Sequence, residues 1–85
     1  MLRITTLYPD AGHCLLRLEG QVAGLWVEEL QRQCAQELAH PRQLTLDMSG
    51  VRYLDQGARD FLWELIGQGA ILENCSPFVS EQLRR

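Results

Sequence analysis

This chain of 85 residues has no long apolar run and no cluster of basic residues. No stretch approaches the roughly 18 apolar residues of a membrane-spanning helix. The first residues also lack the apolar segment of a secretory signal peptide. We therefore expect a cytoplasmic protein that does not insert into a membrane. Net charge is -3, and the only adjacent basic pair is Arg84-Arg85, which we expect to complement the dipole of a last helix. Nucleic-acid binding is not expected, because phosphate recognition needs a basic surface.

Residue patterns that carry catalysis or bind cofactors are scarce. The seven glycines match neither a phosphate-binding loop nor a dinucleotide-binding fingerprint. The three cysteines form no CxxC pair, and we expect them to be small buried residues in a reducing compartment. Neither histidine has the context of a metal ligand or a catalytic base. The sequence predicts no enzymatic activity, no cofactor and no metal site. The cysteines are Cys14, Cys34 and Cys75, and the histidines are His13 and His40.

One pair of carboxylates leaves an alternative open. Asp47 lies at the end of a strand-like segment and Asp55 at the start of a helix-like segment, so the two side chains could meet on one rim. Paired carboxylates can perform acid–base chemistry or bind magnesium. The other interpretation is a solvated strand residue and a helix N-cap, and it is the one we favour.

Hydrophobic periodicity predicts seven elements. Alternating apolar residues, such as Cys14, Leu16 and Leu18, indicate strands. Apolar residues at steps of three and four indicate helices. Ser49-Gly50 is expected to end the third strand, and Asp55 suits the N-cap of the second helix. We predict strands over residues 2–8, 14–19, 44–48 and 70–73, helices over 24–39 and 56–66, and a last helix that Ser76-Pro77 begins.

The order of these elements predicts one α/β domain over residues 1–85 with a mixed four-stranded sheet. The order is β-β-α-β-α-β-α. The short first connection indicates an antiparallel hairpin. The later alternation of strands and helices indicates parallel strands with right-handed crossovers. Trp26 and Trp63 lie beside the apolar stripes of their helices, where they could be core-edge residues or anchors for a partner.

Two segments resemble one family. Residues 46–55 read Leu-Asp-Met-Ser-Gly-Val-Arg-Tyr-Leu-Asp, which is similar to the central signature of STAS domains. Residues 72–79, Leu-Glu-Asn-Cys-Ser-Pro-Phe-Val, resemble the last strand and the following helix of that family. The predicted order of elements agrees with this STAS-like fold along almost the whole chain. The resemblance implies a binding module of the kind found in anti-sigma factor antagonists and in sulfate transporters.

The resemblance also implies a phosphorylation site. In the antagonists, an anti-sigma factor kinase phosphorylates the second Ser or Thr after the signature Asp, and the phosphate releases the partner. Here Asp55 matches the signature Asp, Gln56 the first Ser, Gly57 the acceptor position and Ala58 the glycine. A shift of one residue would place Gln56 at the acceptor position. Neither alignment provides a hydroxyl there, so we expect no phosphoacceptor in this segment. Ser49 and Tyr53 are hydroxyls nearby. Ser49 belongs to the structural turn after the strand, so we do not expect it to serve as a substitute acceptor.

These observations predict a non-catalytic protein–protein interaction module without the usual Ser/Thr phosphorylation switch. Its partner would be an anti-sigma factor kinase. One alternative is an accessory subunit that binds the ATPase of an ABC-type lipid transporter, and another is a sensor of a small ligand or nucleotide. A homodimer formed through an exposed sheet edge stays open. The predicted partner-binding residues are Ser49, Asp55, Gln56, Gly57, Ala58 and Arg59.

Overall fold

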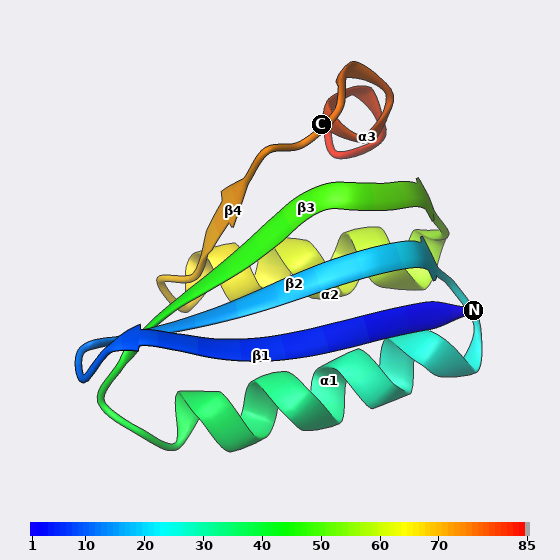
Figure 1. The fold of residues 1–85 in the computed structure, drawn as a ribbon. Helices are drawn as coiled ribbons and strands as arrows, with labels where there is room; N and C mark the ends of the chain where they lie inside the picture. The colour runs from blue at the N-terminus through cyan, green and yellow to red at the C-terminus, as the bar shows by residue number, and fades with distance from the viewer. Residues whose placement is uncertain (85) are drawn as a thin grey trace.

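The computed structural model describes residues 1–84 and contains the seven predicted elements in the predicted order (Figure 1). Arg85 lies outside the described residues. The prediction for the C-terminal basic pair therefore concerns Arg84 alone, whose Nη1 lies 3.2 Å from Glu81 Oε2. The elements are β1 (Leu2–Asp10), β2 (His13–Val22), α1 (Leu25–Leu38), β3 (Gln43–Leu54), α2 (Gln56–Gly67), β4 (Ile71–Glu73) and α3 (Pro77–Gln82).

The four strands form one mixed sheet in the order β1-β2-β3-β4, which confirms the predicted architecture. β1 and β2 are antiparallel, whereas β2 and β3, and β3 and β4, are parallel. The hairpin turns at Ala11-Gly12, where the Asp10 carboxylate accepts a hydrogen bond from Gly12 N at 2.8 Å. A side-chain oxygen that bonds the backbone two residues later stabilises such a tight turn.

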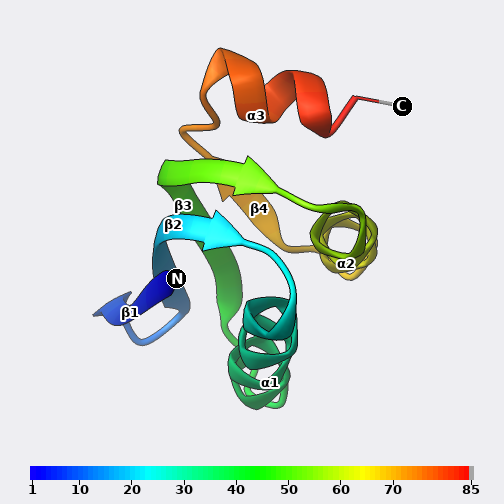
Figure 2. The ribbon, with the colours of Figure 1, turned by 90° about the vertical axis from the view of Figure 1, so that its right-hand side faces the viewer.

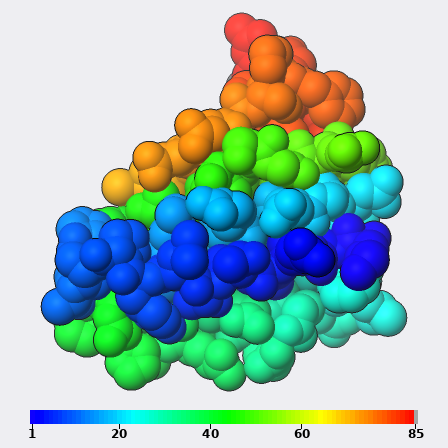
Figure 3. Space-filling view, in the orientation of Figure 1, coloured from blue at the N-terminus to red at the C-terminus, as the bar shows by residue number. Residues whose placement is uncertain are grey.

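Helices α1 and α2 pack on the same face of the sheet (Figure 2). The core lies between them and the strands, and it contains Leu16, Leu46, Leu30 and Leu62, all fully buried. α3 lies beyond β3 and inserts Val79 into the same core. The opposite face of the sheet is not covered by α1 or α2 (Figure 3). None of the helices described within residues 1–84 is long and apolar enough to cross a membrane.

The third strand is longer than the sequence predicts, because Ser49-Gly50 does not end it. β3 continues to Leu54, and its register against β2 shifts twice, so that β3 carries an extra residue at each shift. A β-bulge of this kind turns the side chains that follow it to the other face. Buried residues therefore recur at steps of three, at Met48, Val51 and Leu54, instead of steps of two. β2 also continues past the predicted end at Gly20, to Val22.

Gly50 lies at the first register shift, where β2 approaches closely. A Cβ at residue 50 would come within 2.9 Å of Leu18 O and 2.9 Å of the Glu19 side chain. Real Cβ atoms do not approach a carbonyl oxygen so closely, so the two strands would have to separate. Glycine is therefore required here by the close approach of the backbones.

Gly50→Ala should lower the free energy of unfolding by about 1–3 kcal/mol, the usual range for overpacking. The matched control is Gly67→Ala, because a Cβ at residue 67 meets no atom within 4 Å and the residue is helical. That control should be neutral or stabilising by about 0.5–1 kcal/mol. Urea unfolding of the two variants measures the difference, and equal stabilities would contradict the packing argument.

Candidate functional site

The Asp55 carboxylate caps two helices at once. Asp55 is the N-cap of α2, as predicted, and its Oδ1 accepts a hydrogen bond from Ala58 N at 2.8 Å. Its Oδ2 accepts a second bond, also at 2.8 Å, from Gly24 N. Gly24 is the N-cap of α1, and a glycine has no side chain that could supply a capping oxygen. One aspartate thus satisfies backbone donors at the start of both long helices.

The topology explains why one side chain reaches both helices. β2 and β3 are parallel neighbours, so their carboxyl ends meet at the same edge of the sheet. Asp55 follows Leu54 directly, and its backbone N–H donates to Val22 O, at the end of β2, at 3.2 Å. The backbone N–H groups of Gly24 and then Ala58 hold the pKa of the Asp55 carboxyl below its usual range, against a smaller opposing effect of burial. The carboxylate is therefore ionised at neutral pH.

A glutamine of α3 supports the end of β3. β4 pairs only with Thr45–Asp47, so the last residues of β3 have no strand on that side. Gln82 replaces the missing strand, because its Oε1 accepts from Leu54 N at 3.1 Å and its Nε2 donates to Leu54 O at 2.9 Å. Sequence reasoning missed this contact, since a glutamine in a short helix carries no signal for it. These two hydrogen bonds, which we call the α3 clamp, fix Leu54, the residue immediately before Asp55.

The residues that follow Asp55 differ in their exposure. Gln56 and Gly57 are exposed, Arg59 is half-buried and Ala58 is fully buried. Gln56 accepts a hydrogen bond from Arg59 at 2.7 Å and donates one to Asp60 at 3.0 Å. The Ala58 side chain therefore belongs to the core, and only its neighbours offer side-chain or backbone surface to a partner.

Gly57 lies in the regular first turn of α2. Its φ is not positive, and a Cβ there would lie 3.6 Å from Asp55 Oδ1, which is an ordinary contact. Neither the backbone nor the available space requires glycine. The family acceptor position could therefore hold a serine side chain, but in this chain it holds none.

Asp47 does not meet Asp55, which overturns the hypothesis of a paired acid–base or magnesium site. The two residues are separated by the remaining length of β3, roughly 20–25 Å at about 3.3 Å per residue with some shortening at the two bulges. Asp47 accepts bonds from Ser49 N at 3.0 Å and Asn74 Nδ2 at 3.2 Å, and Arg17 Nε lies 3.6 Å from its other oxygen. These groups keep the pKa of Asp47 low, the Ser49 backbone bond contributing most. Within residues 1–84, no group of three or more metal-ligating side chains converges.

Ser49 is placed in β3 beside Asp47 and not beside the start of α2. It is exposed, and it lies six residues before Asp55, roughly 15–20 Å along the strand. The predicted partner-binding residues therefore form one group, from Asp55 to Arg59, with Ser49 apart from it.

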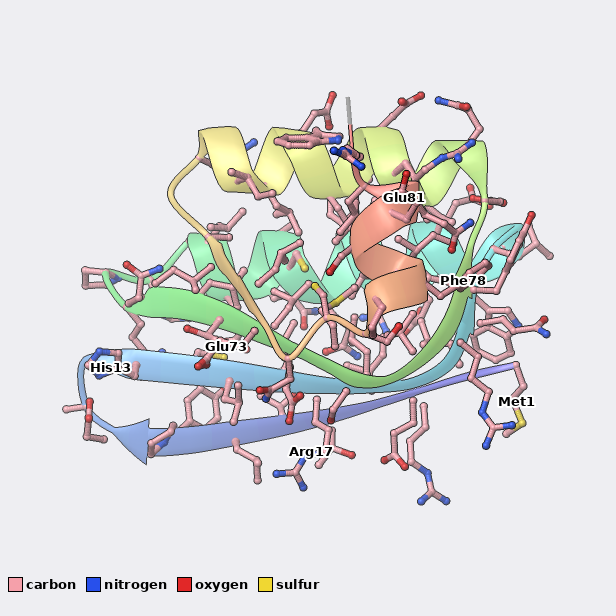
Figure 4. The ribbon with its side chains drawn as sticks, turned by 90° about the horizontal axis from the view of Figure 1, so that it is seen from above. Met1, His13, Arg17, Glu73, Phe78 and Glu81 are labelled. Carbon is pink, nitrogen blue, oxygen red and sulfur yellow. The ribbon has the colours of Figure 1, made fainter. Side chains whose placement is uncertain are left out.

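Exposed apolar side chains gather at the end of the sheet where Asp55 lies. Leu25, the first residue of α1, is 81% exposed, and Tyr53, two residues before Asp55, is 43% exposed. Phe78 of α3 is 57% exposed and lies, with Met1, at the end of the sheet away from His13 (Figure 4). We define the capping-end surface as Met1, Leu25, Tyr53, Gln56, Gly57 and Phe78. Sequence reasoning missed Leu25 and Phe78, because both lie in segments that read as amphipathic helices.

Comparison with known protein families gives a match over almost the whole chain. The family model described as the STAS domain matches residues 5–85. A search of curated proteins finds no match. The matched range includes the Asp55 segment, both capped helices and the α3 clamp.

Asp55→Ala should lower the free energy of unfolding by about 2 kcal/mol at neutral pH, at about 1 kcal/mol for each lost cap. The folded pKa of Asp55 lies below its unfolded value, so this stabilisation is complete above pH ~5 and is lost as pH falls through the folded pKa. The difference in free energy of unfolding between wild type and the Asp55→Asn variant should therefore shrink on acidification below pH ~4.

The control is Asp60→Asn, which makes the same chemical change on the exposed side of α2, where the carboxylate accepts only from Gln56. It should change stability by less than about 0.5 kcal/mol. Urea unfolding at pH 7 and pH 3 makes the comparison. A pH-independent difference for Asp55→Asn would contradict the role of the charged carboxylate.

Proposed function

The chain belongs to the STAS domain family, and on that premise we propose that it is a non-catalytic module that binds a partner protein through the capping-end surface. The proposed partner is an anti-sigma factor kinase, the class of protein that anti-sigma factor antagonists bind. The observation that carries the proposal is the exposure of Leu25, which follows the Gly24 that donates to Asp55, and of Tyr53, two residues before Asp55. The exposed Phe78 lies at the same end of the sheet, away from His13 (Figure 4). Aromatic side chains such as Tyr and Phe are enriched at protein interfaces, and Tyr is enriched among the residues that dominate binding energy.

The rigidity of this end favours binding without rearrangement. The Asp55 bonds to Gly24 N and Ala58 N fix the starts of both helices, and Gln82 fixes Leu54. A surface that is ordered before binding loses little conformational entropy when the partner arrives. Exposed apolar side chains on such a frame can contribute most of their transfer free energy to the complex.

The same segment supports control by means other than phosphorylation. A phosphate at the start of α2 would be stabilised by the backbone N–H groups there, and it would introduce about two negative charges into an apolar interface. The acceptor position holds Gly57, which has no hydroxyl. We infer that partner binding is constitutive, or is controlled by the amounts of the two proteins.

The double variant Tyr53→Ala and Phe78→Ala should weaken binding of the partner at least about tenfold, because both side chains are exposed and truncation costs little stability. Individually expressed anti-sigma factor kinases and transporter ATPases from the source organism, titrated by calorimetry, measure the effect. The control is Ile66→Ala, since Ile66 is 37% exposed at the opposite end of α2. Binding of a transporter ATPase alone would replace the kinase as partner, and unchanged affinity in the double variant would contradict the proposed surface.

The wild-type chain should take up no phosphate when incubated with such a kinase and ATP. Gly57→Ser should restore an acceptor, because the added Cβ makes only an ordinary contact with Asp55. Intact-mass spectrometry measures the phosphate on each chain. Stoichiometric phosphate on wild-type Ser49, or on any residue from 55 to 59, would show that a switch exists in this protein.

A further inference from the structure

The outer edge of β1 presents unpaired backbone groups. β1 is an edge strand of the sheet formed by residues 1–84. Gln21 N donates to Met1 O, which fixes the phase of the antiparallel ladder. Hydrogen-bonded pairs alternate with non-hydrogen-bonded pairs along such a ladder. Every second residue after Met1 therefore bonds to β2, and the N–H and C=O groups of Leu2, Ile4 and Thr6 point away from the sheet.

This part of the edge lacks the features that usually prevent strand pairing. Proteins protect edges with proline, bulges, charges or a covering segment. In β1, Pro9 and the register shift between Leu7 and Asp10 affect only the far end. Arg3 is the single charged residue before them. The edge from Leu2 to Thr6 is therefore open to an added strand.

Helix α1 forms a shelf beside this edge, apolar at Leu25 and Trp26 and polar at Glu29 and Gln33. α1 projects past β1, as the ribbon and the space-filling view show (Figures 1 and 3). Between β1 and α1 lies a groove of about 510 Å³, lined by Leu2, Ile4, Leu25, Trp26, Glu29 and Gln33. Trp26 is 40% exposed there. The far end of α1 is tied to β1 by the bond from the Tyr8 hydroxyl to Glu37 Oε2, 2.8 Å long.

We propose that β1 and this β1–α1 groove bind an extended segment of a partner protein by strand addition. The segment bonds to the outward groups of Leu2, Ile4 and Thr6. Its alternate side chains are apolar and pack against Trp26 and Ile4, since alternate residues of a strand share one face. The remaining side chains lie on the open face of the sheet, where Arg3 is exposed and takes part in no ion pair within residues 1–84. An acidic residue in the segment complements that charge.

A second copy of this chain fits the same edge less well than a single extended segment. Symmetric pairing of two β1 strands would place them about 4.8 Å apart. Each α1 projects past its own β1, so both helices would lie beneath the junction. Packed helices need 8–10 Å between their axes. A single extended segment with no helix attached at that point avoids the conflict.

The experiment pans a phage library of random ten-residue peptides against the immobilised full chain. A selected peptide is then titrated into the ¹⁵N-labelled protein. We expect the selected peptides to alternate apolar and polar residues, with shift changes centred on the amides of residues 2–6 and the Trp26 indole. Absence of enrichment, or shifts confined to residues 53–59, would overturn the proposal.

Two variants test the contacts separately. Thr6→Pro removes an outward N–H that does not bond to β2. Trp26→Ala removes the aromatic side chain that α1 contributes to the groove. Each variant should lower the affinity for the selected peptide at least about tenfold, while Ile66→Ala should change that affinity less than about twofold. If Thr6→Pro does not fold, Trp26→Ala and the shift map decide. The Tyr53→Ala and Phe78→Ala double variant should bind the peptide like wild type, which separates this proposal from the function proposed above. A dimer in sedimentation analysis that Trp26→Ala dissociates would assign the edge to a second copy and overturn the partner segment.

Discussion

The two hydrogen bonds accepted by the Asp55 carboxylate hold together the end of this domain where both long helices begin. They join the first turns of α1 and α2, 31 residues apart in sequence at Gly24 and Asp55, to the end of β3. The low pKa of Asp55 follows from the same bonds, because they stabilise the charged form. This one side chain therefore fixes the starts of both helices, next to the exposed Leu25 and Tyr53. The signature aspartate therefore has a structural role that does not depend on phosphorylation.

The geometry of β3 brings Asp55 to that position. Two bulges turn Val51 and Leu54 toward the core, and Gly50 allows β2 to approach at the first of them. At the end of the strand, the Gln82 amide supplies the hydrogen bonds that the short β4 cannot reach. The last helix thus supports the end of β3 through Gln82 and adds the exposed Phe78 to the capping-end surface. Bulges that re-aim side chains are common near functional sites for this reason.

The proposed capping-end surface and the β1–α1 groove lie on either side of the start of α1. Leu25 belongs to both, while Tyr53 and Phe78 belong only to the first and Trp26 only to the groove. Two partner segments, or two parts of one partner, could therefore be distinguished by substitution. The groove arises because α1 overhangs the sheet edge, a property of the packing that no local pattern encodes.

The sequence by itself determined the order of elements, the mixed sheet and the capping role of Asp55, because periodicity and capping are local properties of neighbouring residues. It also predicted the missing hydroxyl at Gly57. It was wrong about the end of β3 at Ser49-Gly50, since bulges shift the periodicity on which that expectation rested. For Asp47 and Asp55, the favoured interpretation of a strand residue and a helix N-cap agrees with the structure, and the paired-carboxylate alternative does not. Only the tertiary structure decided that Asp55 caps α1 as well, that Gln82 pairs with Leu54 and that Ala58 is buried. The Asp55–Gly24 and Gln82–Leu54 hydrogen bonds join residues 31 and 28 positions apart. The geometry that brings these residues together exists only once the sheet has formed.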